Sequence, residues 1–190
     1  MDPTFLIIIG GLLVVFYALY AGLIKKRNSA LEALSTVDVQ LKQRLDLVPN
    51  ILKIAKKFME HEKALLTDIT TLRTQAIAPY NPNEIKAVQE HLATAEQLST
   101  KMSQLMLNVE NYPTLKSDQT MIQAMQSYNE AEAQIAAARR FYNSAITLLN
   151  NAVEIFPSSM IAKMIGITQM PFFKAEEAAH AAINTDDFLK

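Results

Sequence analysis

The residues that come nearest to a catalytic motif in this chain are the adjacent pair His61-Glu62. Zinc proteases place a second histidine four residues after the first, because that spacing puts two imidazole ligands on one face of a helix. Position 65 of this chain is a leucine, so the pattern is incomplete. His91 and His180 stand alone in the sequence. The sequence therefore predicts no metal site and no cofactor.

Nucleophiles and paired carboxylates also lack the neighbours that catalysis requires. Ser158-Ser159 does not lie in a Gly-x-Ser-x-Gly turn, and Glu130 and Glu132 have the pattern of solvated or capping charges. The chain contains no cysteine, which excludes thiolate metal sites and cysteine nucleophiles. Gly166 is its only glycine after residue 24, so a phosphate-binding glycine loop is excluded as well. We predict a protein that is not an enzyme and takes no small-molecule substrate.

A long uncharged segment lies directly before a basic cluster near the N-terminus. Residues 5–24 contain no charged side chain and would span about 30 Å as a helix, the thickness of a bilayer core. Lys25, Lys26 and Arg27 follow, whereas only Asp2 and the amino group lie on the other flank. Because a cleaved signal peptide carries its basic residues before the apolar core, an uncleaved anchor is favoured.

The charge asymmetry around this anchor predicts its direction. Positive residues stay on the cytoplasmic side, so the N-terminus should lie outside and the body in the cytoplasm of a bacterial cell, as a single-pass inner-membrane protein. Residues 25–57 carry eight Lys/Arg against three Asp/Glu, with few aromatic residues. Anionic lipid headgroups explain this basic stretch better than nucleic acid does. We expect Lys25, Lys26 and Arg27 at the membrane interface.

Apolar residues beyond the anchor follow the three-four spacing of a helical bundle or coiled coil. The first stripe runs from Leu34 to Ala76 and keeps its phase across Pro49, which favours one kinked helix over a corner between two packed helices. Both alternatives remain open. The second stripe spans 85–109, after a turn at 78–84.

Capping residues mark the ends of the second and third predicted helices. Asn81, Pro82 and Glu84 have the order of a helix cap, a first helical residue and a capping box. A third stripe spans 121–156, preceded by Ser117 and Asp118 as possible caps and stopped by Pro157.

The fold predicted from these patterns is all-α, an N-terminal transmembrane helix followed by an antiparallel bundle of long helices. Few glycines and many strong helix formers agree with it. We divide the chain into an anchor with its basic flank (1–27), a long-helix bundle (28–157), an apolar packing or interfacial segment (158–173) and a polar tail (174–190).

Four charged residues fall on the apolar stripes: Arg44, Glu62, Glu132 and Arg139. Their long side chains can reach solvent at the edge of a stripe. Alternatively, they form a paired ion network inside the bundle that sets the helix register. Either reading is structural and implies no catalysis.

Several separated motifs follow one another along the chain: 38–50 (DVQLKQRLDLVPN), His61-Glu62, Arg73, 112–116 (YPTLK), Glu132, Ile135, 138–143 (ARRFYN), Phe156-Pro157 and Phe172-Phe173. In this order they resemble the LemA family over nearly the whole chain, from the anchor to about residue 173. Tyr128-Asn129 and the last residues depart from the family pattern. The resemblance implies one membrane helix and a helical bundle, with no catalytic residues to carry over and no established role.

Three hypotheses for function follow. The first is a non-enzymatic, membrane-anchored scaffold or adaptor, with the family residues Asp46, Asn50 and Arg73 facing a protein partner or another copy. The second is a membrane-organising protein that self-assembles into an oligomer on the bilayer. The third is a regulatory partner of a membrane enzyme.

Overall fold

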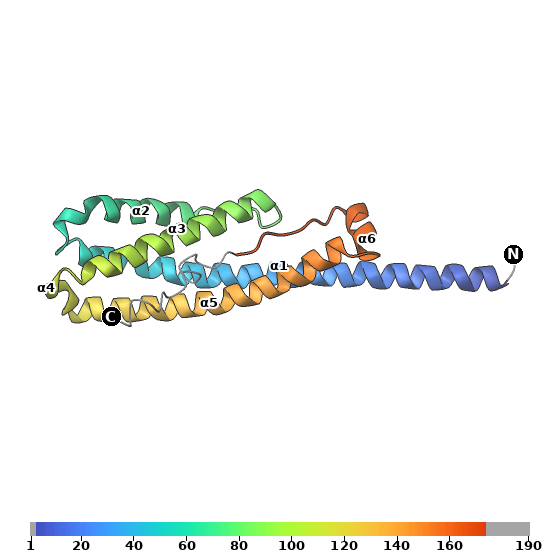
Figure 1. Ribbon diagram of the computed structural model, residues 1–190, viewed down its shortest axis with the longest axis horizontal. Coiled ribbons are helices and arrows are strands. Elements are labelled where there is room, and N and C mark those ends of the chain that lie inside the picture. Colours follow the sequence, from blue (N-terminus) through green and yellow to red (C-terminus); the bar gives the residue numbers. More distant parts are fainter. Residues whose placement is uncertain (1–2, 174–190) are drawn as a thin grey trace, which may run out of the picture.

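The computed structural model describes residues 3–173, and over that range the chain is helical without any strand. Its elements are α1 (Pro3–Ala55), the short 3-10 helix η1 (Glu60–Glu62), α2 (Lys63–Ile77), α3 (Ile85–Val109), α4 (Pro113–Lys116), α5 (Gln119–Glu154) and α6 (Ser158–Ile165) (Figure 1). The prediction of an all-α fold is confirmed. The predicted polar tail, 174–190, lies outside the described residues.

The first helix is longer than any other element and contains both the apolar segment and the first half of the predicted stripe. It passes through Pro49 without ending, which is the first of the two alternatives. The continuation of this helix to Ala76 is wrong, because α1 ends at Ala55 and the chain reverses before α2. Phe58, the stripe residue in the reversal, packs against the core, so the apolar spacing persists although the helix does not. Periodicity reports which residues are buried and not whether the chain turns between them.

The helices form an antiparallel arrangement of two pairs (Figure 1). α5 runs back along α1, and the hairpin of α2 and α3 covers the half of the bundle that is far from the N-terminus. The core has two clusters. One includes α1 residues from Leu23 to Leu41, and the other includes α1 residues from Leu45 to Ala55.

The helix starts agree only in part with the predicted caps. Asp118 caps α5, since its Oδ1 accepts hydrogen bonds from the backbone N–H groups of Thr120 at 2.8 Å and Met121 at 3.0 Å. The predicted capping box of α3 is wrong. Asn81 Oδ1 accepts from the Asn83 N–H at 3.0 Å in a turn, and α3 begins only after Glu84, whose side chain makes no cap bond.

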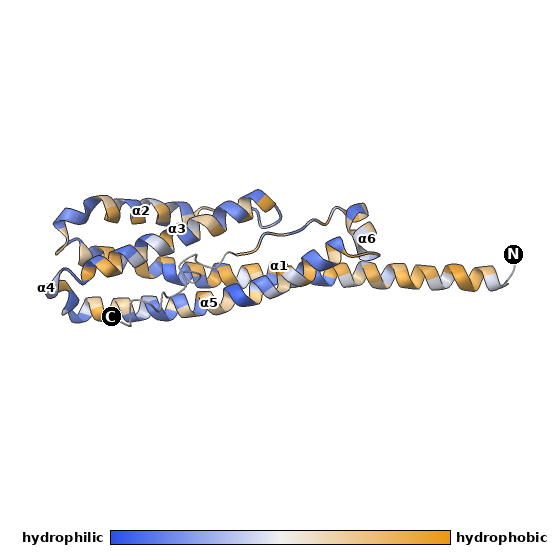
Figure 2. Cartoon of the chain, viewed as in Figure 1, coloured by the Kyte–Doolittle hydropathy of each residue, from blue (hydrophilic) through white to orange (hydrophobic). Residues whose placement is uncertain are grey.

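The first turns of α1 project from the bundle as a single exposed helix. Residues 3–18 are exposed throughout, and Figure 2 shows them as a hydrophobic rod beyond the body. Among residues 3–173, α1 is the one helix long and apolar enough to cross a membrane. Leu19 is the first residue of α1 that packs against the core, and Leu23, which is 1 % exposed, is the first that is buried. The bundle thus starts inside the segment that the sequence assigned to the anchor.

After α6 the chain returns along the bundle as an extended segment, 166–173. Two asparagines of α5 hold it by pairing their side-chain amides with its backbone. Asn150 donates to the Met170 carbonyl at 3.0 Å and accepts from its N–H at 2.9 Å. Asn143 does the same with Phe173, at 2.8 Å and 2.9 Å. These bonds satisfy backbone groups that have no secondary structure to pair with.

Candidate functional site

The largest buried polar group in the bundle is the guanidinium of Arg44, a side chain only 1 % exposed. Its Nη1 donates to Glu132 Oε1 of α5 at 2.8 Å, and its Nη2 donates to the Ala95 carbonyl of α3 at 2.9 Å. Ser99 of α3 also donates to Glu132 Oε1, at 3.3 Å. This ion centre joins α1, α3 and α5 at one level.

The ion centre separates the two clusters of the core. On α1 it lies between Leu41 and Leu45, which belong to different clusters. Tyr128 lies on its distal side, and burial raises the pKa of the Tyr128 phenol above its ordinary value of 10, although the charge of Arg44 opposes part of that effect. A charged layer between apolar clusters penalises any shift of one helix along another, because a shift would bury unpaired charge.

The other two charged residues of the apolar stripes lie elsewhere. The Arg139 guanidinium stacks over the Phe173 ring, with 4.1 Å between the guanidinium carbon and the ring centroid. This cation–π contact helps to hold the end of the extended segment. Glu62 lies half-buried in η1, at the distal end of the bundle. Of the four residues, the structure therefore brings Arg44 and Glu132 together as an ion pair.

Arg73 binds the backbone carbonyl that Pro49 leaves without its helical partner. A helix residue normally donates its N–H to the carbonyl four residues earlier, and proline has no N–H. The carbonyl concerned is that of Leu45, and Arg73 Nε of α2 donates to it at 2.9 Å. Arg73 thus connects α2 to the proline site of α1. Asp46 and Asn50, the other two predicted partner residues, are exposed on α1.

A second polar cluster joins residues that are far apart in the sequence. Asp38 of α1 accepts from the Tyr80 hydroxyl at 2.7 Å and contacts His91 Nε2 of α3 at 3.1 Å. The rings of Tyr80 and His91 stack with centroids 4.1 Å apart. Burial, followed by the hydrogen bond to Asp38, raises the pKa of Tyr80 above its ordinary value. Sequence reasoning missed this cluster and treated His91 as isolated. The one sequence signal for this cluster was the position of Asp38 at the start of the motif 38–50.

This cluster forms one wall of a groove between α1 and the α2–α3 connection, which we call the α1 groove. Its volume is about 410 Å³. Charged residues Lys42 and Asp46 lie beside Asp38 along α1, and Ile77 contributes an exposed apolar side chain opposite them. A groove with two carboxylates, one ammonium and an apolar edge can bind a polypeptide segment by hydrogen bonds and apolar contact.

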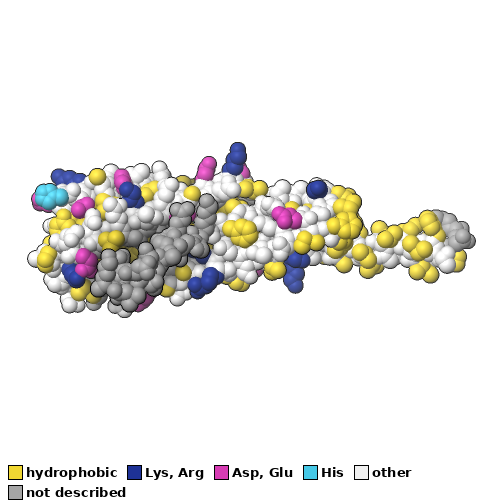
Figure 3. Space-filling view, in the orientation of Figure 1, with side chains coloured by type: hydrophobic (Ala, Val, Ile, Leu, Met, Phe, Trp, Pro, Cys, Tyr) yellow, Lys and Arg dark blue, Asp and Glu magenta, His cyan; other side chains and the backbone are white. Residues whose placement is uncertain are grey.

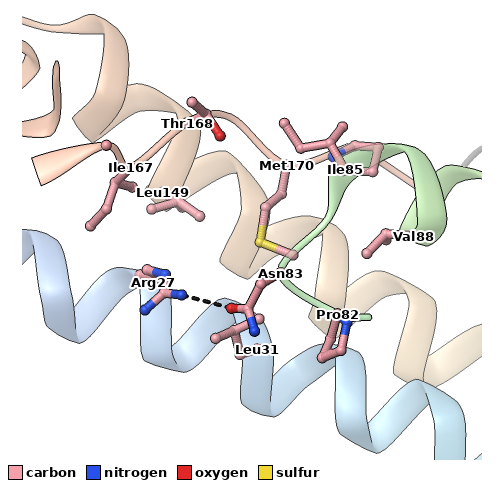
Figure 4. Close-up of a pocket in the computed structure, with 12 residues that line it drawn as sticks. Arg27, Leu31, Pro82, Asn83, Ile85, Val88, Leu149, Ile167, Thr168 and Met170 are labelled. Atoms are coloured by element: carbon pink, nitrogen blue, oxygen red, sulfur yellow. Dashed lines mark hydrogen bonds between the residues drawn. The ribbon is translucent and has the colours of Figure 1, made fainter. Parts of the chain in front are cut away.

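At the end of the bundle near the apolar segment, the basic cluster is shared between solvent and protein. Lys25 is exposed and Lys26 is half-buried. Arg27 Nη2 donates to Asn83 Oδ1 at 2.7 Å, beside a small cavity of about 90 Å³ that the extended segment closes at Ile167 (Figure 4). Arg27 is therefore bonded to the turn that precedes α3. Within residues 3–173 no group of three or more His, Asp or Glu side chains is arranged to hold a metal ion.

Comparison with known proteins gives the family directly. Residues 33–186 match the model of the LemA family. The chain belongs to the LemA family. It is 22 % identical over 181 residues to Protein LemA of Metamycoplasma hominis, an alignment that covers 91 % of this chain and 78 % of that protein. Magnetosome proteins MamQ 1 and MamQ 2 of Paramagnetospirillum magneticum are each 23 % identical over 176 residues, covering 82 % of this chain.

This LemA-family chain spans 65 % of the length of the two MamQ proteins, a little less than two thirds. Several residues that carry the LemA resemblance make contacts between elements in the structure. They include the Arg44–Glu132 ion pair, the Arg73 bond at the proline site and the Asn143 bonds to Phe173. In this chain these LemA motif residues thus connect helices to one another and to the extended segment.

Proposed function

We infer that this protein is a non-enzymatic, membrane-anchored helical scaffold that presents a protein-binding groove at a defined height above the bilayer. The observation that carries this proposal is the continuity of α1. One helix of 53 residues contains both the exposed apolar segment and the part of α1 that packs in the bundle. A continuous helix has no flexible linker, so the body has a set distance from the anchor. From Leu23 to Asp38 the rise is about 23 Å, at 1.5 Å per residue.

The α1 groove and the neighbouring exposed residues Asp46 and Asn50 are the surface we assign to the partner. Asp46 and Asn50 lie on α1 itself. The carboxylates of the groove supply polar contacts, and Ile77 supplies an apolar one. Arg73 supports this surface from behind through its bond to the Leu45 carbonyl. The partner is another protein or a second copy of this chain.

We place the anchor in a bacterial inner membrane with its N-terminus outside and the bundle in the cytoplasm. Supporting this direction, Lys25, Lys26 and Arg27 flank the apolar segment on the body side, and no basic side chain precedes it. Because the chain has no cysteine, single cysteines at Thr4 and Lys57 report topology without background. In intact spheroplasts an impermeant maleimide should label Thr4→Cys only. Labelling of Lys57→Cys before lysis would reverse the orientation.

Photocrosslinking in the full-length protein tests the scaffold function. A photoreactive residue at Asp46 or Ile77 should give an adduct of defined mass in native membranes, whereas one at Ser144, an exposed position on α5, should not. A doubled mass identifies a second copy of this 21.2 kDa chain, and any other mass identifies a different protein. If neither groove position gives an adduct that Ser144 lacks, the proposal is refuted.

A further inference from the structure

The apolar surface of the short helix α6 is wider than the part that is buried. Ile161 and Ala162 are buried, and the helix packs on both α1 and α5. Met160 and Met164, one turn apart on α6, are 60 % and 73 % exposed beside the buried side chains. Phe156, in the turn before α6, is 73 % exposed. Ser159 and Lys163 occupy only part of the circumference of α6, so an exposed apolar surface remains next to the buried one.

The exposed face of α6 lies at the level where the apolar segment of α1 enters the bundle. Leu23 of α1 and Ile161 of α6 belong to the same core cluster, and Tyr20, one turn before Leu23, is exposed. Figure 3 shows hydrophobic side chains gathered at the end of the body from which the N-terminal segment projects. The two apolar surfaces are therefore neighbours.

The length of the exposed segment fixes what can cover α6. From Pro3 to Ala18, before Leu19 packs against the core, α1 has 16 residues, or about 24 Å, which is less than the thickness of a bilayer core, about 30 Å. The helix therefore leaves no spare residues between that core and the bundle. A bilayer that holds this segment must then reach the near end of the bundle, where the exposed side chains of α6 stand.

We propose that α6 is an interfacial foot, in which Phe156, Met160 and Met164 enter the headgroup–acyl boundary of the same bilayer that holds α1. This inference rests on the proposed anchoring. Lys163 lies next to Met164 on the exposed side, and Lys25 is exposed on α1, so two ammonium groups are available to lipid phosphates at the boundary. The occupant of the apolar face is the lipid bilayer, and the foot fixes the body against it at a second point.

Fluorescence quenching of the full-length protein in vesicles tests the foot. A polarity-sensitive label is attached to a single cysteine at Met164 and the protein is reconstituted into vesicles of neutral and anionic phospholipid. Leu107→Cys on α3 is the matched control, because Leu107 is 71 % exposed against 73 % for Met164. Val14→Cys, 68 % exposed in the projecting segment, reports insertion of the anchor.

The expected result is an iodide quenching constant about fivefold lower at Met164 than at Leu107, because a foot buried by 5–10 Å excludes an aqueous ion. A lipid carrying a shallow nitroxide should quench Met164 and not Leu107. If Met164 is as accessible to iodide as Leu107 while Val14 is shielded, the foot is refuted and the anchor stands. If Val14 is accessible too, the anchoring itself fails. Shielding of Met164 that disappears on dilution with lipid would show that a second copy covers α6, which also overturns the proposal.

Discussion

The hydrogen bond from Arg73 to the Leu45 carbonyl should stabilise the fold because Pro49 leaves that carbonyl without its helical donor. Replacing Arg73 by alanine removes a charged donor and leaves the carbonyl of a helix interior without a protein partner. Hydrogen bonds to charged groups contribute about 1.5–3 kcal/mol. Replacing Pro49 by alanine restores the N–H that would bond to the same carbonyl within the helix. The Arg73→Ala cost should then fall by about 1 kcal/mol or more.

A double-mutant cycle measures this dependence. The full-length protein, Arg73→Ala, Pro49→Ala and the double variant are unfolded with urea in one detergent, and the helix signal is followed by far-UV circular dichroism. Arg140→Ala, which removes an exposed arginine of α5, is the control for loss of a positive charge, and we expect about 0.5 kcal/mol or less from it. If Arg73→Ala costs the same within about 0.5 kcal/mol in both backgrounds, Arg73 acts in some way other than by replacing the proline's missing donor.

Three further predictions concern the core, a helix cap and alkaline pH. Glu132→Ala should lower the free energy of unfolding by about 3 kcal/mol, because it leaves the Arg44 charge buried and unpaired. In urea unfolding, the double variant with Arg44→Leu should recover most of that loss. A double variant as unstable as the single one would contradict the ion centre. Asp118→Ala should lower the free energy of unfolding by about 1 kcal/mol, and an unchanged urea midpoint would show that its cap bonds do not matter. Burial raises the pKa of Tyr128 and Tyr142, so the unfolded chain loses these protons first as pH rises above 10, and stability should fall by about 1.4 kcal/mol per pH unit for each. Phenolate absorbance that titrates fully near pH 10 in the folded protein would refute this.

The long helices were predictable because each has a three-four spacing of apolar residues, which favours a helix over a strand. α5 from Gln119 to Glu154 also has local stop signals at both ends, Asp118 and Pro157. The reversal after Ala55 was missed, since its residues keep the spacing and it contains neither glycine nor proline. This reversal therefore has no local turn signal in the sequence.

The sequence predicted which polar residues are buried better than it predicted their hydrogen-bond partners. The stripe placed Arg44 in the interior. Its pairing with Glu132, 88 residues later, depends on the axial position of α5 relative to α1, which the stripe does not give. The cluster of Asp38, Tyr80 and His91 depends on the α2–α3 connection folding against α1, and sequence spacing contains no information about that approach. The sequence also did not predict that Arg73 bonds to its own chain at the proline site, and its contact with an external partner stays a prediction.

Because α1 runs unbroken from the apolar segment to Ala55, it is also a lever. From Leu23 to Ala55 its arm is about 48 Å, so each 10° of tilt at the anchor moves the distal end of the bundle sideways by about 8 Å. Hydrophobic thickness sets the tilt of a membrane helix, and the distal end of this molecule would therefore convert bilayer thickness into lateral displacement. Contact of α6 with the bilayer on one side of α1 would restrict the tilt to directions in which α6 stays at the membrane surface.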